Sequence, residues 1–431
     1  MSLGSHRGTK CVDKNKSSRL RLLAHYLAAT KNEVAIDKSV YSLCSCEPSD
    51  LGYAPRPAKL ISIAGSNLRS IRLIINLAAF MWRVGLDKCW FLLDFLRLMI
   101  VKDRFDDRYS NLPSNLPIGL SFSPRALGVL ESAGVLNGMG ALIKCPGSEA
   151  LDLDSKVLAF NFSALLTWQD CIQALRLSFI ISSRMRKKAL FDVWRLQSYT
   201  AFKWIAFYLA IEKMSSHKFV ITDHYDRWAV LMDRLVAERS KKESSLTIVQ
   251  HGSLVGLAST SMESSFSVEI PTRLCNVAKL YVYNEGSAEV FRHYILSHRA
   301  TEHSLEVEFF KPKISLSPVS SDFSVLIVGH AICENFHLYL YDQVVSNSTV
   351  DFFYKPHPTV SPSKEIKSRG WHMIEQADFF PEVDLLISYP STLVAEYEGR
   401  GIGAVLHPLA IKPEEYCEVL SRINNKLQAV K

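Results

Sequence analysis

Two short stretches near the end of the sequence place residue types that bind phosphate directly after apolar runs. The first run, residues 352–354, leads into Lys355, Pro356, His357 and Pro358. The second run, residues 385–387, leads through a Ser-Tyr-Pro turn to Ser391 and Thr392. Lysine offers a compact charge to a phosphate, histidine can donate a hydrogen bond to it, and proline fixes the backbone of the turn. We therefore predict a donor phosphate site formed by these residues: Lys355, His357, Pro358, Ser391 and Thr392.

Ser391 and Thr392 fall where a helix is predicted to begin, and the free N–H groups at such a point favour an anion. Glu396, one helical turn further on, is placed to accept hydrogen bonds from ribose or sugar hydroxyls. Each feature also has an ordinary structural explanation. Serine and threonine commonly begin helices, an exposed helix glutamate needs no ligand, and prolines often end a strand.

Polar residues close other apolar runs as well. Gly329 ends the run at 324–328, and Glu334 begins the helix predicted after it, so this loop is a further candidate for donor binding. Earlier in the chain, Asp223 and His224 follow one run and His251 follows the next. Any of these last three side chains is a candidate base for an acceptor hydroxyl, and each is also compatible with a structural role.

The order of the segments predicts an α/β protein with two doubly wound, Rossmann-type domains. From residue 218 onward, strand-like runs alternate with helix-like segments, as in a parallel sheet that has helices on both faces. The alternation stops in a segment rich in Ser, Pro and Lys and then restarts. Five further strand-like runs follow, at 324–330, 351–354, 371–374, 384–387 and 402–406. Two such units would face a ligand cleft at the carboxyl ends of their strands.

The predicted domain boundaries follow from these changes in composition. Residues 1–55 are expected to be a basic, disordered lead-in, and residues 56–304 an acceptor-side domain that begins with a strand at 59–66. A linker at 305–322 and a donor domain at 323–412 come next. The closing segment, 413–431, is expected to be a helix that packs back across the linker.

Composition and motifs argue against several classes of protein, and they leave membrane contact open. The net charge is +7 and the nine cysteines form no CxxC pair, which suits reduced thiols in a cytoplasm. The sequence has no nucleic-acid-binding motif, no Walker or GxGxxG loop and no convincing metal-ligand set, because the Asp106-Asp107 doublet is interpreted as solvated surface. Charges interrupt the apolar segment 68–101, so it predicts core helices or, alternatively, a patch that lies on the inner membrane.

The Lys355–Pro358 turn and the Ser391-Thr392 pair resemble motifs of the GT-B glycosyltransferases that assemble bacterial surface polysaccharides. The first is similar to the His-Pro motif of sialyl- and polysialyltransferases, and the second to their paired Ser/Thr motif. Similar patterns occur in CDP-glycerol polyol-phosphate transferases and in capsule Kdo transferases. The resemblance covers roughly residues 218–410. It implies that His357 contacts the nucleotide, that Ser391 and Thr392 contact its phosphate, and that a first-domain acid or histidine is the base.

We therefore expect a GT-B glycosyltransferase, independent of metal and of other cofactors, that uses a nucleotide-sugar donor, with CMP-sugars first. The expected acceptor is a surface glycan of capsule or lipopolysaccharide, free or lipid-linked, and the expected location is the cytoplasm with peripheral membrane contact left open. Alternatives are a polyol-phosphate transferase that uses a CDP-polyol and a UDP-sugar epimerase or hydrolase of the same fold. A non-enzymatic, membrane-associated scaffold in polysaccharide assembly is the remaining alternative.

Overall fold

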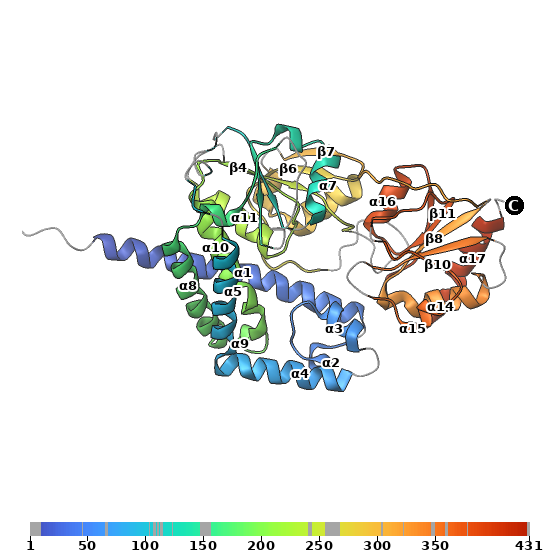
Figure 1. Ribbon diagram of the computed structural model, residues 1–431, viewed down its shortest axis with the longest axis horizontal. Helices are drawn as coiled ribbons and strands as arrows, with labels where there is room; N and C mark the ends of the chain where they lie inside the picture. The colour runs from blue at the N-terminus through green and yellow to red at the C-terminus, as the bar shows by residue number, and fades with distance from the viewer. Residues whose placement is uncertain are drawn as a thin grey trace, which may run out of the picture.

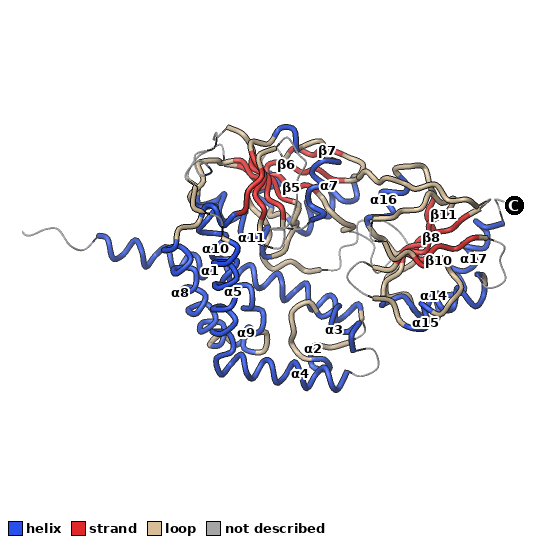
Figure 2. The backbone as a smooth tube through the Cα atoms, in the orientation of Figure 1, coloured by secondary structure: helices blue, strands red, loops and turns tan. Residues whose placement is uncertain are grey.

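The computed structural model contains two parallel α/β domains and an N-terminal group of helices (Figures 1 and 2). It describes residues 10–428 except for residues 45, 65–67, 103, 107–108, 110–111, 113–114, 123, 147–156, 240–243, 255–267, 303–304, 322, 346–349, 358–360 and 377. Pro358 and Asp107, named above, lie outside the described residues.

The first domain is built on a seven-stranded parallel sheet in the order β3-β2-β1-β4-β5-β6-β7. The chain adds strands on one side of β1 and then returns to add β4 and the rest on the other side, so the order reverses between β1 and β4. In register, Ile118 of β1 pairs with Ala141 of β2 and with Phe219 of β4. The strands are β1 (Ile118–Ser121), β2 (Ala141–Lys144), β3 (Ala159–Asn161), β4 (Lys218–Ile221), β5 (Ser245–Val249), β6 (Val277–Val282) and β7 (Glu306–Phe309).

Helices cover this sheet, and one of them is buried on almost every side. Helix α10 (Ala201–Glu212) carries apolar residues around its whole circumference, which is the pattern of a helix enclosed by other elements. It packs against α8, α11 and α5. The other helices of the domain are α7 (Pro124–Ser132), α8 (Trp168–Arg186), α9 (Ala189–Asp192), α11 (Arg227–Glu238), α12 (Glu285–Val290) and α13 (His298–Glu302).

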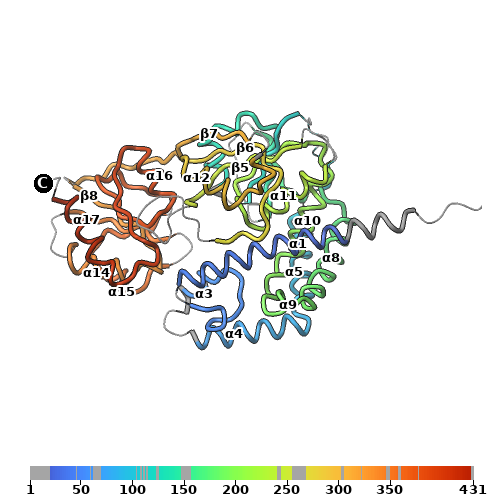
Figure 3. The backbone as a smooth tube through the Cα atoms, turned by 180° about the vertical axis from the view of Figure 1, so that it is seen from behind, coloured from blue at the N-terminus to red at the C-terminus, as the bar shows by residue number. Residues whose placement is uncertain are grey.

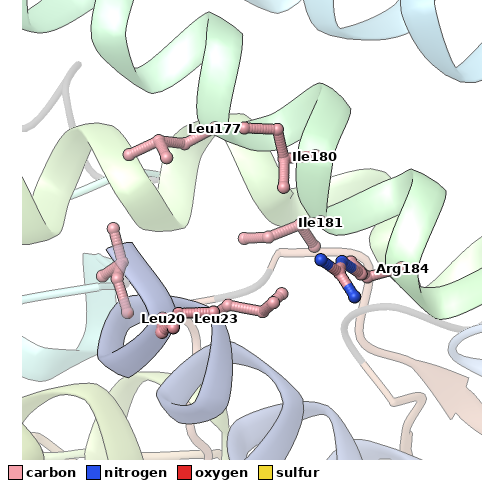
Figure 4. A pocket seen from close by; sticks show the side chains of 7 residues that line it. Leu20, Leu23, Leu177, Ile180, Ile181 and Arg184 are labelled. Atoms are coloured by element: carbon pink, nitrogen blue, oxygen red, sulfur yellow. The ribbon is translucent and has the colours of Figure 1, made fainter. Parts of the chain in front are cut away.

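The N-terminal segment is a long helix, so the predicted disordered lead-in is wrong over the described residues. Helix α1 (Lys10–Leu43) buries Leu22, Tyr26 and Ala29 at helical spacing in the core of the first domain. The sequence-based prediction overlooked these apolar residues because the segment is rich in basic residues. Leu20 and Leu23 of α1 face Leu177, Ile180 and Ile181 of α8 across a cavity of about 60 Å³ (Figure 4).

Four more helices follow α1. They are α2 (Pro48–Leu51), α3 (Pro57–Ala64), α4 (Leu68–Met81) and α5 (Asp87–Val101). Helix α4 lies away from both sheets, and α5 runs back to the first domain (Figures 1 and 3). The strand predicted at 59–66 is therefore wrong, because a short apolar run fits a helix as well as a strand. Between α4 and α5 a wide helical turn (Trp82–Leu86) ends in a kink at Gly85, whose φ of 145° is outside the helical range.

The second domain has a five-stranded parallel sheet in the order β10-β9-β8-β11-β12, which confirms the five predicted strands. Its order reverses between β8 and β11. The strands are β8 (Ser324–Val328), β9 (Asp351–Lys355), β10 (His372–Met373), β11 (Leu385–Ser388) and β12 (Gly403–Leu406). The helices are α14 (Glu334–Gln343), α15 (Lys364–Lys367), α16 (Thr392–Glu398) and α17 (Tyr416–Gln428).

Two details at the ends of the domains correct the sequence-based boundaries. Residues 306–309, expected in the linker, form β7 and pair with β6 as the last strand of the first sheet. Helix α17 does not pack across the linker; it buries Val419, Ile423 and Leu427 in the core of the second domain. The fold class itself, α/β with two Rossmann-type doubly wound domains, is confirmed.

Candidate functional site

In an open α/β sheet, ligands bind beyond the carboxyl ends of the strands where the strand order reverses. In the first domain this point lies between β1 and β4; Phe122 follows β1, and His224 belongs to the loop after β4. In the second domain it lies between β8 and β11, after which come His330 and Tyr389. Both sets of loops contain residues that the sequence had singled out.

A cavity of about 930 Å³ opens at the reversal point of the first sheet. Loops after β1, β4 and β5 form one side of it, and α1, the start of α3 and α10 form the other. Two of the three candidate bases, His224 and His251, line it, whereas Asp223 does not. The lining residues are Glu33, Ile36, Asp37, Val40, Arg56, Pro57, Ala58, Phe122, Pro146, Tyr199, Thr200, Lys203, His224, Tyr225, Asp226, Arg227, Trp228, His251, Gly252, Ser253 and Leu254.

His224 and His251 lie side by side, with 4.6 Å between their ring centroids, and their hydrogen bonds give them different tasks. The backbone N–H of His251 donates to Nε2 of His224 at 2.8 Å, so that nitrogen carries no proton. Burial, assisted by the neighbouring His251, lowers the pKa of His224 well below its usual value. His224 is therefore a neutral, buried support for the β5 loop.

His251 is held in the orientation that a general base needs. Its Nδ1 is bonded to the carbonyl oxygen of Thr222, and because a carbonyl can only accept, Nδ1 must carry the proton. The lone pair is then on Nε2. A histidine whose Nδ1–H is fixed by an acceptor presents Nε2 in one tautomer and one orientation, as catalytic histidines do.

Asp223 forms a carboxyl pair with Asp226 at the start of α11. Burial, with a smaller contribution from Glu33, raises the pKa of Asp223 to about 6. Burial and the Asp223 carboxylate together raise the pKa of Asp226 well above its ordinary value. Asp226 also accepts hydrogen bonds from the backbone N–H groups of Trp228 and Ala229 at 2.8 and 3.0 Å. The pair thus retains a proton beside the cavity while it caps α11.

Helix α1 contributes residues to the cavity that the sequence reading missed. Glu33 accepts a hydrogen bond from the backbone N–H of Arg227 at 3.0 Å and pairs with its guanidinium at 3.2 Å. Burial alone would raise the pKa of Glu33, but Arg227 outweighs burial and lowers it. Asn32 donates to the carbonyl oxygen of Tyr225 at 2.7 Å. Helix α1 therefore fixes the loop that carries the candidate bases.

Asp37, one turn further along α1, is an unusual carboxyl group. Burial and the nearby Glu33 raise its pKa to about 7. It accepts hydrogen bonds from the side-chain amide of Gln197 and, at 3.1 Å, from the backbone N–H of Arg56. Arg56 has a φ of 55°, in the left-handed region that non-glycine residues seldom adopt. Such strain is commonly found at ligand sites, and the backbone of Arg56 is held there by Asp37.

In the second domain, His330 and His357 come together after β8 and β9. Their ring centroids are 4.9 Å apart, and His330 is 5.8 Å from the ring of Tyr389. Burial, together with His357, lowers the pKa of His330 to about 4, so this imidazole is neutral at pH 7. Its Nδ1 accepts the N–H of Ile332 at 3.2 Å, which leaves the proton on Nε2. His330, missed as a site residue, is therefore a neutral hydrogen-bond donor through Nε2.

Ser391 and Thr392 begin α16, but Ser391 is not its ordinary cap. Among the described residues the Ser391 hydroxyl makes no capping hydrogen bond to α16 and instead lies 3.1 Å from the hydroxyl of Ser388. Thr392 Oγ1 is 3.6 Å from the position that a Cβ would take on Gly252, in the loop after β5. Gly252 has a φ of 80°, which favours glycine there.

Gly252 lines the cavity of the first domain, so its proximity to Thr392 places this cavity near the start of α16. Figure 1 shows α16 on the side of the second domain that faces the first. Glu396, further along α16, adds to burial in raising the pKa of Tyr283, which follows β6. Glu396 thus lies at the domain junction, where the predicted cleft was placed.

Three of the predicted donor residues make contacts within the second domain. The ammonium group of Lys355 is buried and donates to the carbonyl oxygens of Gln376 and Phe379 at 3.1 and 2.8 Å, so it ties the β9 and β10 loops together. Gly329 is needed because a Cβ there would be 2.4 Å from the hydroxyl of Tyr354. The carboxylate of Glu334 accepts the N–H of Ser363 at 3.1 Å.

One group of described side chains has the composition of a metal site: Cys333, His337 and His407. All three are buried, but hydrogen bonds already account for them. His407 donates from Nδ1 to the carbonyl of Pro408 at 2.8 Å, and its Nε2 lies 3.3 Å from Nε2 of His337. His337 Nδ1 is 3.1 Å from the hydroxyl of Tyr354. The cluster is a core network beneath the β8 loop.

Comparisons with known proteins gave only distant structural likeness. No family model matches the sequence, and no curated protein matches it. Among solved structures, the crystal structure of MurG from Acinetobacter baumannii matches at 12% sequence identity and a TM-score of 0.30. The match covers 72% of this chain and 83% of that chain. A likeness this distant says nothing about the activity of the protein.

Proposed function

We propose that this protein is a glycosyltransferase that moves a sugar from a nucleotide-activated donor to a glycan acceptor. The acceptor would occupy the cavity of the first domain, and the donor would occupy the loops after β8, β9 and β11. The observation that carries the proposal is the orientation of His251, whose Nδ1–H is fixed by the Thr222 carbonyl and whose Nε2 is the basic nitrogen. It belongs to a loop that lines the cavity and also meets the second domain at Thr392.

In the proposed reaction, Nε2 of His251 removes the proton from an acceptor hydroxyl. The acceptor oxygen then bonds to the anomeric carbon of the donor sugar, and the bond from that carbon to the donor phosphate oxygen breaks. An imidazole is suited to this step because its ordinary pKa lies near neutral pH. Asp223 does not line the cavity, so its carboxyl group is not placed to act as the base.

The leaving phosphate gains negative charge as the bond breaks, and fixed hydrogen-bond donors stabilise that charge. We assign this task to the Nε2–H of His330, to His357 beside it, and to the hydroxyls of Ser391 and Thr392. These groups are all supplied by the protein, so we propose that transfer needs no metal. Full activity in excess EDTA is the expected result, and loss that Mg²⁺ restores would contradict it.

We favour a CMP-sugar as donor and a bacterial surface glycan as acceptor. Support for this comes from the His357 and Ser391-Thr392 motifs, which resemble those of sialyltransferases and related surface-polysaccharide transferases. The cavity, with Glu33, Asp37, Arg56 and Lys203 in its lining, offers both acceptors and donors for the hydroxyls of a glycan.

A thermal-shift panel of CMP, CDP, UDP and GDP tests the donor site directly. We expect CMP or CDP to raise the melting temperature of the wild-type protein and to have little effect on His357→Ala. His372→Ala is the matched control, because His372 is an exposed histidine on β10 of the same domain. If no nucleotide stabilises the wild type, the proposed function is wrong. Stabilisation by UDP alone would contradict the CMP-sugar assignment and keep the nucleotide site.

A further inference from the structure

Helix α4 presents an apolar face to solvent that the proposed function does not use. Six large apolar side chains between residues 69 and 84, along α4 and into the turn after it, are exposed, and Leu73 reaches 73% exposure. At about 100° per residue they fall within an arc of about 120°. The six are Leu73, Ile74, Leu77, Phe80, Met81 and Val84. A contiguous apolar face of this kind marks a binding surface rather than ordinary scatter.

The exposed charged side chains that α4 and the turn after it contribute beside this face are all basic. Arg69, Arg72 and Arg83 are exposed and lie within an adjoining arc of about 60°. Every exposed charged side chain between residues 69 and 101, a stretch that is described throughout, is basic. The two acids of the stretch, Asp87 and Asp94, are buried. We call the six apolar residues and these three arginines the α4 surface.

The third side of α4 holds it on the protein. Ile75 and, in the following turn, Trp82 are buried, and the indole N–H of Trp82 donates to Ser198 at 2.8 Å. Arg83 pairs with Asp192 of α9 at 3.0 Å, and α9 adds exposed Leu190 and Val193 nearby. Helix α4 lies along the edge of the molecule farthest from both sheets, and α5 turns away from it (Figures 1 and 3). The α4 surface is thus held on the rest of the protein by buried side chains and lies at the edge of the molecule.

We propose that the α4 surface docks the protein onto an anionic lipid bilayer. The helix would lie in the plane of the interface, with its apolar residues among the acyl chains and its arginines on lipid phosphates. Within the described residues no helix combines the length and apolar character that crossing a bilayer requires, so contact through α4 is peripheral.

Charge favours lipid over a second copy of this chain as the occupant. A symmetric dimer would bring the same face of each copy together and so place arginines opposite arginines. An anionic bilayer instead attracts them, and each added cation near such a surface strengthens binding. The proposal does not depend on the glycosyltransferase assignment, because nucleotide binding and vesicle binding use different parts of the molecule.

Co-sedimentation with vesicles tests the proposal. We expect the full-length protein to bind vesicles of phosphatidylcholine and phosphatidylglycerol, and to bind pure phosphatidylcholine at least about tenfold more weakly. Phe80→Glu should weaken binding to the anionic vesicles at least about tenfold, because it places a charge among acyl chains. Phe309→Glu is the matched control and should bind like the wild type, since Phe309 is 57% exposed on β7 and Phe80 is 59% exposed.

A second pair of variants changes charge alone. Arg69→Gln with Arg72→Gln should lower binding to anionic vesicles about tenfold or more, and Lys364→Gln with Lys367→Gln, which changes two exposed lysines of α15, should not. This pair also keeps the test open if Phe80→Glu fails to fold, as judged by circular dichroism. No binding of the wild type to anionic vesicles would overturn the proposal. So would a dimer, seen by light scattering, that Phe80→Glu converts to a monomer while vesicle binding is unchanged.

Discussion

The reversal points of the two sheets are built from opposite chemistry. In the first domain, a buried arginine pairs with the carboxylate of Glu33, and α1 supplies both Glu33 and the buried Asp37. In the second domain, neutral histidines and hydroxyls line the loops, and most come from the strands and helix starts of that domain alone. The first site can therefore accept protons from hydroxyl groups, and the second can donate hydrogen bonds to a phosphate.

Buried carboxyl groups of the first domain and buried histidines of the second respond to acid in opposite ways. Asp37 and Asp223 have raised pKa values, of about 7 and about 6, so the folded first domain holds protons that the unfolded chain releases above about pH 4. Their contribution to stability is present at low pH and is lost as the pH rises. His330 and His407 have lowered pKa values, of about 4, so the unfolded chain takes up protons that the folded second domain refuses. Their contribution is lost as the pH falls below about 6.5.

The largest expected effect comes from removing the proposed base of the first site. His251→Ala should lower the rate of sugar transfer by about 10²- to 10⁴-fold, because the acceptor hydroxyl would have no base. The thermal shift caused by nucleotide should remain, since the donor loops are unchanged. His293→Ala, which removes an exposed histidine of the same domain, is the control and should transfer at the wild-type rate. Wild-type activity in His251→Ala would rule out this base.

Next in size is the loss of the buried arginine. Arg227→Met should lower the free energy of unfolding by about 3–5 kcal/mol, because Glu33 would lose the guanidinium that offsets the desolvation of its carboxylate. Urea denaturation measures the change. Arg369→Met removes an arginine from an exposed ion pair with Asp342 in the second domain and should cost no more than about 1 kcal/mol. Equal losses in the two variants would contradict the contrast between the domains.

A smaller effect separates the domains by pH. Of seven tryptophans in the sequence, Trp371 alone belongs to the second domain, so fluorine NMR of 5-fluorotryptophan protein can follow each domain during urea unfolding. Between pH 7 and pH 5, the midpoint reported by Trp371 should fall, while that reported by first-domain tryptophans should fall less or rise. Asp37→Asn should remove part of the first-domain effect. A parallel fall in both domains for the wild type would show that the opposing groups do not decide the response.

The smallest effect concerns the hydroxyl at the start of α16. Ser391→Ala should weaken nucleotide binding several-fold, which corresponds to about 1 kcal/mol for one hydrogen bond. Isothermal titration with the nucleotide that gives the largest thermal shift provides the measurement. Ser368→Ala, an exposed serine of the same domain, is the control. Unchanged affinity in Ser391→Ala would remove this residue from the donor site.

The second domain was the easier of the two to predict because its elements follow one another closely in the sequence. Each strand is a short apolar run that ends in a turn, so local patterns were enough to place β8, β9, β10, β11 and β12. The N-terminal helices were harder. The apolar run at 59–66 fits a strand or a helix, and the basic stretch at 1–55 fits a disordered segment or a helix. Only the surfaces against which they pack decide between these alternatives, so α1 and α3 were missed.

The place of a polar residue after a strand was predicted better than the contacts that its side chain makes. Lys355 does follow β9, but its ammonium group is bound by carbonyl oxygens of the loop after β10. His224 and His251 were equal candidates in the sequence, and only their hydrogen bonds to each other and to Thr222 distinguish the support from the base. For His330, the only indication in the sequence was the glycine before it, which marks the end of the β8 strand.

The sequence by itself determined the strands of both sheets from β4 onward, except β7, and the polar turns that follow them, because both depend on neighbouring residues in the chain. Only the tertiary structure decided which of those turns carry ligand-facing groups. That choice depends on partners brought from far along the chain, such as α1 against the loop after β4 and Gly252 against Thr392. Hydrogen-bond partners and burial fix a side chain's protonation and direction, and neither is a property of the local sequence.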